Sequence, residues 1–70
     1  MSKQDIDKSY FLSFCIEQFK HSRVISGAES AEIIFLSGTA EYLIDNFEVL
    51  HTQSRQWLIE EIEERLKQQK

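Results

Sequence analysis

Apolar residues recur at helical spacing along almost the whole chain, which predicts a protein built from α-helices. The first helix is expected from about Lys3 to His21. Its apolar residues cover most of the helix circumference, so it is predicted to be the central and most buried element, with Phe11 and Phe14 in the core. These apolar residues are Ile6, Tyr10, Phe11, Leu12, Phe14, Cys15, Ile16 and Phe19.

Serine and glycine mark where the next two helices begin and end. Ser26 and Glu29 fit the S-x-x-E capping box, in which the two residues satisfy each other's free amide groups at a helix start. A second helix is therefore expected over about Gly27–Leu36, and Gly38 ends it because glycine tolerates the left-handed conformation. A short third helix is expected over about Thr39–Asn46. The residues predicted to face inward are Ala31, Ile34, Phe35, Tyr42, Leu43 and Phe47.

The last helix carries the clearest amphipathic pattern. Residues 47–51 form an apolar connector, and either Thr52 or Ser54 can cap the helix, which is expected to run to about Gln68. Its inward stripe consists of Leu58, Ile59, Ile62 and Leu66. The sequence thus predicts an all-α fold, a compact bundle of four helices with a short third helix, in a single domain over residues 3–68. Residues 1–2 and 69–70 are expected to be frayed ends.

Length and composition exclude several classes of protein. Seventy residues form one small domain, whose marginal core leaves no room for an enclosed substrate pocket. The single cysteine cannot form an internal disulfide, and no segment has the apolar core of a signal peptide or the roughly 18 apolar residues of a membrane span. We therefore expect a cytoplasmic protein without a membrane partner.

Neither a metal site nor catalytic chemistry is expected. A metal site would have to recruit Cys15, His21 and His51 from separate segments without a ligand motif, so no metal or other cofactor is predicted. Cys15 is expected to be a small buried hydrophobe, because no base stands at a useful spacing to stabilise its thiolate. His51 is expected to fix the connector by hydrogen bonding. The sequence contains no recognisable nucleophile–base pair or glycine-rich phosphate loop, so an enzyme is not expected.

Charge is distributed unevenly along the chain. The whole chain has 12 acidic and 8 basic residues, a net charge of −4, but residues 27–64 alone contain nine acidic residues and one basic residue. Trp57 lies roughly 140° from the centre of the apolar stripe of the last helix, on the side that carries Glu61 and Glu64. Large aromatic side chains ringed by charge are typical of interfaces. The predicted partner-binding residues are Trp57, Glu60, Glu61 and Glu64.

The same residues also have a structural interpretation. The carboxylates can form a solvated helix face, partly neutralised by Glu61–Arg65 and Glu63–Lys67 pairs at helical spacing. Trp57 can instead fold over the apolar connector and belong to the core. The sequence leaves both interpretations open.

Residues 27–46 could be mistaken for a helix-turn-helix, and two features argue against that motif. Ile34 stands four residues before Gly38, where close packing of the two helices usually demands a small residue. The helix that would read DNA has two acidic residues, Glu41 and Asp45, and no basic one. DNA affinity depends on Lys and Arg at the phosphates, so binding to nucleic acid is disfavoured.

Three segments together resemble a family of short bacterial proteins, the domain of unknown function numbered 3791. They are residues 14–19, Ser26-Gly27 before a helix, and Tyr42-Leu43 leading into residues 49–52. The Leu-His-Thr step before the last helix is the most specific part, and Trp57 stands where a tyrosine would be expected. The resemblance covers about Tyr10–Leu66 and implies an all-helical bacterial cytoplasmic protein. It also implies a neighbouring protein similar to ADP-ribosyltransferases, which this chain would bind or neutralise as an antitoxin does its toxin.

The sequence therefore predicts a non-enzymatic helical interaction module whose acidic, Trp57-bearing side binds a protein partner. The resemblance points to an ADP-ribosyltransferase-like protein as that partner. One alternative is a self-associating structural protein, in which a homodimer covers those apolar side chains of the first helix that the other helices leave exposed. The other alternative is a DNA-binding regulator, which the charge of the chain disfavours.

Overall fold

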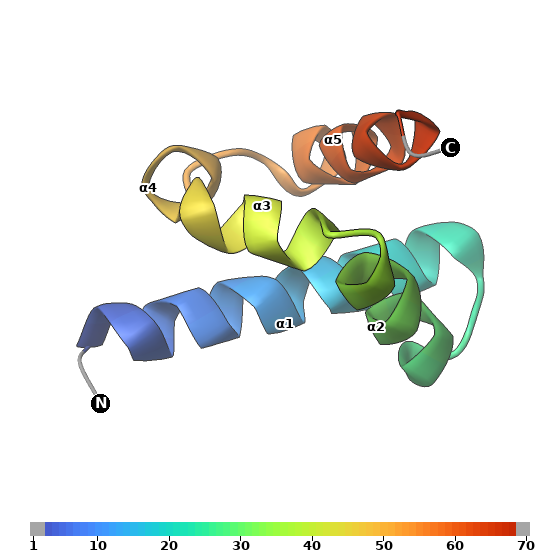
Figure 1. The fold of residues 1–70 in the computed structure, drawn as a ribbon, viewed down its shortest axis with the longest axis horizontal. Coiled ribbons are helices and arrows are strands. Elements are labelled where there is room, and N and C mark those ends of the chain that lie inside the picture. Colours follow the sequence, from blue (N-terminus) through green and yellow to red (C-terminus); the bar gives the residue numbers. More distant parts are fainter. Residues whose placement is uncertain (1–2, 69–70) are drawn as a thin grey trace.

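A computed structural model describes residues 3–68 as a set of five α-helices with no strand among them (Figure 1). They are α1 (Lys3–Arg23), α2 (Gly27–Leu36), α3 (Thr39–Asp45), α4 (Phe47–Leu50) and α5 (Arg55–Lys67). The all-α prediction is confirmed, but the expected connector is itself a one-turn helix, so there are five helices rather than four. The expected frayed ends, residues 1–2 and 69–70, lie outside the described residues.

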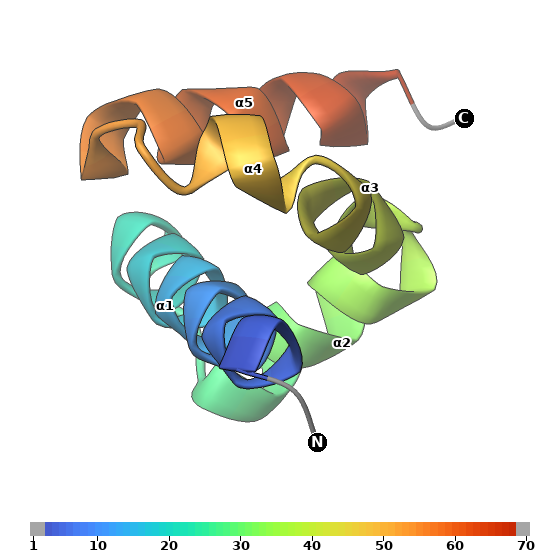
Figure 2. The ribbon, with the colours of Figure 1, turned by 90° about the vertical axis from the view of Figure 1, so that its left-hand side faces the viewer.

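The longest helix organises the others. α1 runs along the length of the molecule and contacts α2, α3 and α5. Figure 2 looks almost along α1 and shows α2 beside it, α5 across the opposite side of the molecule, and α3 and α4 between them. The N-terminal half of α1 extends beyond α2 and α5, so fewer helices lie next to it there (Figure 1). α1 is therefore central at its C-terminal half and peripheral at its N-terminal half.

One small core joins all five helices. α1 contributes three side chains at four-residue spacing, Phe11, Cys15 and Phe19, which lie on one side of the helix. The core residues from the other helices are Ile34, Ala40, Leu43, Phe47, Leu50, Leu58 and Ile62. Three residues of the predicted α5 stripe face inward, Leu58 and Ile62 in the core and Leu66 packed against it, whereas Ile59 is half-buried and lies outside the core cluster.

Phe14 and Phe35, both expected in the core, are exposed instead. Phe14 is 42% exposed and Phe35 is 55% exposed. The prediction failed because it assumed that a helix apolar on nearly all sides is covered on all sides. The other helices do not surround α1, and α2 packs mainly against α1 and α3, which leaves an outer side of each of these two helices exposed. α1 is therefore not buried around its whole circumference.

Serine side chains cap two helices. The Glu29 backbone N–H donates to Ser26 Oγ at 3.1 Å and begins α2, as predicted. The return contact differs from a capping box, because the Glu29 carboxylate accepts from the Ser26 hydroxyl at 3.4 Å rather than from its backbone amide. Ser54, and not Thr52, caps α5 by accepting from the Trp57 backbone N–H at 3.2 Å.

Two residues in the left-handed region end helices. Gly38 has φ +81° between α2 and α3, where glycine was expected for this reason. Val24 has φ +55° after the last residue of α1. The backbone N–H of Ile25 then donates to the Lys20 carbonyl at 3.2 Å, which is the long hydrogen bond of a Schellman motif. Ile25 packs against the core and fixes the direction in which the chain leaves α1.

An ion pair that sequence spacing did not predict joins the end of α1 to α5. Arg23 at the end of α1 donates from Nε to Glu63 Oε2 at 2.8 Å and from Nη2 to Oε1 at 2.6 Å. This bidentate contact lowers the pKa of Glu63 and raises that of Arg23, mainly through the hydrogen bonds. Both carboxylate oxygens of Glu63 thus bind Arg23 on α1, and the expected partner Lys67 on its own helix contributes a smaller electrostatic attraction.

Candidate interaction surfaces

The four predicted partner-binding residues lie on α5, and the structure separates them into two groups. Trp57 is 39% exposed, so it is not a core residue, and Glu60 and Glu64 are exposed. Glu60 accepts a hydrogen bond from Gln56 Nε2 at 3.1 Å within the same helix. Glu61, in contrast, is half-buried and engaged inside the fold. The exposed group is thus Trp57, Glu60 and Glu64, which we call the Trp57 surface.

Glu61 belongs to a cluster that holds α3 against α5. The Tyr42 hydroxyl donates to Glu61 Oε2, and this hydrogen bond raises the pKa of Tyr42. The guanidinium of Arg65 lies over the Tyr42 ring, 4.0 Å from its centroid, in a cation–π contact. The expected Glu61–Arg65 pairing is therefore replaced by an arrangement in which Tyr42 stands between the two residues.

Most of the acidic residues in the segment 27–64 are exposed. Of its nine acidic residues, the seven exposed ones are Glu29, Glu32, Glu41, Asp45, Glu48, Glu60 and Glu64. The remaining two, Glu61 and Glu63, are half-buried and bind Tyr42 and Arg23. The acidic residues that could attract a basic partner are accordingly distributed over α2 to α5 rather than confined to α5.

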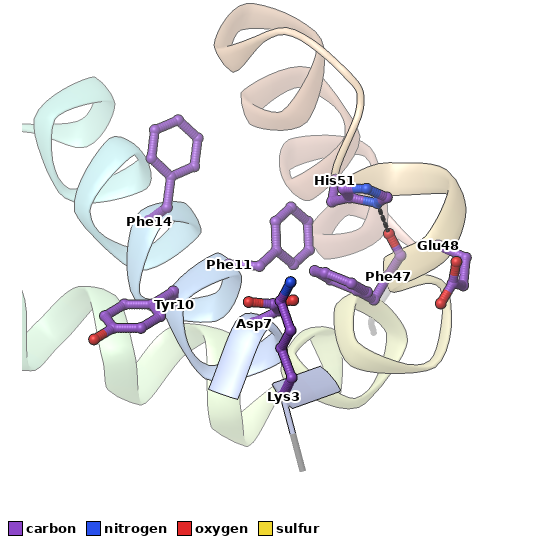
Figure 3. Close-up of a pocket in the computed structure, with 8 residues that line it drawn as sticks. All are labelled: Lys3, Asp7, Tyr10, Phe11, Phe14, Phe47, Glu48 and His51. Atoms are coloured by element: carbon purple, nitrogen blue, oxygen red, sulfur yellow. Dashed lines mark hydrogen bonds between the residues drawn. The ribbon is translucent and has the colours of Figure 1, made fainter. Parts of the chain in front are cut away.

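A second surface, which the sequence analysis did not predict, is an aromatic groove of about 740 Å³ between α1 and α4 (Figure 3). Figure 3 shows Phe11 and Phe47 facing each other across its floor, with ring centroids 5.5 Å apart in an edge-to-face contact. Tyr10 and Phe14 border it on α1, and His51 borders it on the opposite side. The complete lining is Lys3, Asp7, Tyr10, Phe11, Phe14, Phe47, Glu48 and His51.

His51 shapes the far side of this aromatic groove. Its Nδ1–H donates to the Phe47 carbonyl at 2.7 Å, and its ring stacks on the Phe47 ring with centroids 4.5 Å apart. The predicted role of His51, fixing the connector by hydrogen bonding, is confirmed. A carbonyl can only accept, so this contact places a proton on Nδ1.

The sequence did contain a signal for the groove. Ile6, Tyr10 and Phe14 repeat at four-residue spacing, which places them on a different side of α1 from Phe11 and Cys15. The apolar residues of α1 thus divide into a buried side and an exposed side, although together they cover most of the helix circumference.

The residues considered for metal or nucleophilic chemistry do not converge. Cys15 is fully buried, and burial raises the pKa of its thiol to about 12, so the thiol is protonated at neutral pH. His21 is exposed and contacts Glu17 at 3.1 Å, while His51 is held by Phe47. Within residues 3–68, no group of three or more His, Cys, Asp or Glu side chains is placed to hold a metal ion.

The segment compared with a helix-turn-helix is part of the core. Ile34 is fully buried between α2 and its neighbours, and Thr39 and Ala40 at the start of α3 are buried as well. The charged side chains of α3 are Glu41 and Asp45, and both are acidic and exposed. The start of this helix is therefore not presented to a DNA groove.

A family model described as "Protein of unknown function (DUF3791)" matches residues 10–69. No curated protein and no solved structure matches the chain. Within the described part of the chain, no helix is both long and apolar enough to span a membrane.

Proposed function

The chain belongs to the DUF3791 family, whose function is unknown, and we propose that it is a non-enzymatic helical module that binds a protein partner. The proposal locates the module in the bacterial cytoplasm. The observation that carries it is the exposure of Trp57 at 39% on an α5 whose Leu58 and Ile62 are already used for docking to the core.

The chemistry of the Trp57 surface suits a basic protein. Trp57 offers a large apolar contact area, and tryptophan is among the residues that most often dominate binding energy in interfaces. Glu60 and Glu64 lie one turn apart on the same helix and are both exposed. Carboxylates around an aromatic anchor attract a positively charged patch and increase the rate of association. Glu61, which Tyr42 binds, is left out of this contact.

The family resemblance points to a specific candidate partner, and we propose that an ADP-ribosyltransferase-like protein encoded next to this chain is that partner. In that case the acidic module would cover and neutralise its neighbour, as in a toxin–antitoxin pair. The excess of acidic residues exposed on α2 to α5 supports a basic contact surface on the partner.

The test is a binding titration between the purified chain and the ADP-ribosyltransferase-like protein encoded beside it. Trp57→Ala is expected to weaken the complex by about 2 kcal/mol or more while leaving the fold intact. Leu36→Ala is the matched control, because Leu36 is an exposed apolar residue at the end of α2. Complex formation that is equally strong for wild type and Trp57→Ala would contradict the proposed surface.

A charge reversal tests the electrostatic part separately. Replacing both Glu60 and Glu64 with Lys is expected to slow association and to flatten its dependence on salt, with a smaller change in the dissociation rate. Stopped-flow association rates over a range of salt concentrations measure this effect. Unchanged rates at low salt would show that the acidic side chains do not steer the partner.

A further inference from the structure

An exposed stripe of side chains runs along α1 on the side that the other helices leave uncovered. Ile6, Tyr10 and Phe14 form its apolar part, and Tyr10 is 73% exposed. Lys3 and Glu17, both exposed, lie on the same side, because each is seven residues, or about two helical turns, from Tyr10. We call these five residues the α1 stripe.

The α1 stripe is separate from the core side of the same helix. Phe11, Cys15 and Phe19 are buried, whereas every residue of the stripe is exposed. Single exposed apolar residues are ordinary, but three of them aligned along a helix are typical of a surface that receives another helix. Tyr10 and Phe14 also border the aromatic groove, so a helix docked on the stripe would cover one rim of that groove (Figure 3).

The stripe is complementary to itself when it is reversed. Ile6 and Phe14 lie four residues on either side of Tyr10, and Lys3 and Glu17 lie seven residues on either side. Two antiparallel copies related by a twofold axis next to Tyr10 would place each Lys3 opposite the Glu17 of the second copy. The same operation would place each Ile6 opposite a Phe14, so that charges and apolar groups both match.

A parallel arrangement has neither advantage. It would bring Lys3 against Lys3 and Glu17 against Glu17, and like charges across an interface oppose association. Antiparallel packing also sets the positive N-terminal end of one helix dipole beside the negative C-terminal end of the other. The order of residues along the stripe therefore selects the antiparallel pair.

Glu17 is accessible for this contact. Its side chain is 52% exposed, and Lys20 and His21 both approach the same carboxylate oxygen, Oε1, at 3.4 and 3.1 Å. The carboxylate can thus keep its contacts within α1 and accept a further hydrogen bond from a lysine of a second copy.

We propose that a second copy of this chain docks antiparallel on the α1 stripe and forms a twofold-symmetric dimer. This inference does not depend on the Trp57 surface, which lies on α5. One helix from each copy gives a small interface, so the dimer is expected to dissociate on dilution through the micromolar range.

A charge-swap experiment tests both the interface and its direction. Sedimentation equilibrium of the full chain is expected to show a dimer that dissociates on dilution. Lys3→Glu and Glu17→Lys should each weaken it by about tenfold, because each places like charges opposite one another at two symmetric sites. The double variant restores opposite charges and should return dissociation to within about threefold of wild type.

Replacing exposed apolar or aromatic side chains with serine provides a second, independent test. Tyr10→Ser should abolish the dimer at concentrations where wild type is dimeric, whereas Leu36→Ser, 81% exposed on α2, should leave it unchanged. Circular dichroism checks that each variant keeps its helices. The proposal is overturned if wild type is a monomer at millimolar concentration, if Tyr10→Ser dimerises like wild type, or if the double charge variant fails to recover association.

Discussion

The Tyr42 hydroxyl on α3 donates a hydrogen bond to the Glu61 carboxylate on α5, two residues that stand 19 positions apart in the chain. Arg65, one turn after Glu61, lies over the same Tyr42 ring. This hydrogen bond gives Glu61 a structural role, although its position on α5 suggested that it binds a partner. It also gives the short helix α3 a fixed orientation against α5.

Replacing Tyr42 with Phe is expected to lower the free energy of unfolding by about 1 kcal/mol, because the ring stays and only the hydrogen bond to Glu61 is lost. Glu61 is half-buried, so water can partly replace the lost donor. Urea unfolding measures the change. Tyr10→Phe is the control, since the exposed Tyr10 has no hydrogen bond of this kind. Equal losses in the two variants would contradict the role given to Tyr42.

Because of the same hydrogen bond, the stability of the protein is expected to fall in the alkaline pH range. The pKa of Tyr42 is raised above its ordinary 10.0, first by the hydrogen bond to Glu61. Its contribution to stability is therefore complete below about pH 10 and is lost as the pH rises through the higher pKa of the folded state. The Tyr42→Phe variant should lose less stability than wild type over this range.

The Arg23–Glu63 pair is expected to weaken in acid. The pKa of Glu63 is held below its ordinary 4.5, so the stability from this pair is present above about pH 4.5 and lost as the pH falls through the lower folded value. Both side chains are partly exposed, which limits the contribution to about 1 kcal/mol. Glu63→Gln should be less stable than wild type at pH 7 and should approach it at pH 3. Glu64→Gln, next in the chain and exposed, should follow wild type throughout.

Two phenylalanines on α1 should differ sharply when each is replaced by alanine. Phe11 is buried against Phe47, so Phe11→Ala is expected to lower stability by about 3–5 kcal/mol. Phe14 faces solvent at the edge of the groove, and Phe14→Ala should cost less than about 1 kcal/mol for the monomer. Thermal unfolding at concentrations too low for self-association compares them. A larger loss for Phe14→Ala would place the core on the other side of α1.

Cys15 should resist thiol reagents as long as the protein is folded. Its side chain is fully buried, and its pKa of about 12 leaves almost no thiolate at pH 8. Modification is expected to be slow in buffer and fast in denaturant, because reaction requires α1 to separate from its neighbours. A Ser22→Cys variant provides an exposed thiol on the same helix as the positive control. Rapid labelling of native wild type would contradict the burial of Cys15.

Helix bounds could be predicted because their signals act within a few residues. Ser26, Gly38 and Ser54 each begin or end a helix through their own backbone conformation or their own hydroxyl group. The exposure of Phe14 could not be predicted in this way, because it depends on how many helices pack around α1. The binding of Glu61 to Tyr42 likewise depends on how α3 and α5 approach each other.

Val24 marks a position at which the fold has room for added stability. The residue adopts a left-handed conformation that opposes folding by roughly 1–2 kcal/mol for a side chain with a Cβ, and its exposed side chain contributes little packing in return. Exchange of this one residue for asparagine or glycine should relieve the strain and raise the melting temperature. The turn after α1 is thus a place at which an engineer could make this small protein more robust without touching the Trp57 surface, the aromatic groove or the α1 stripe.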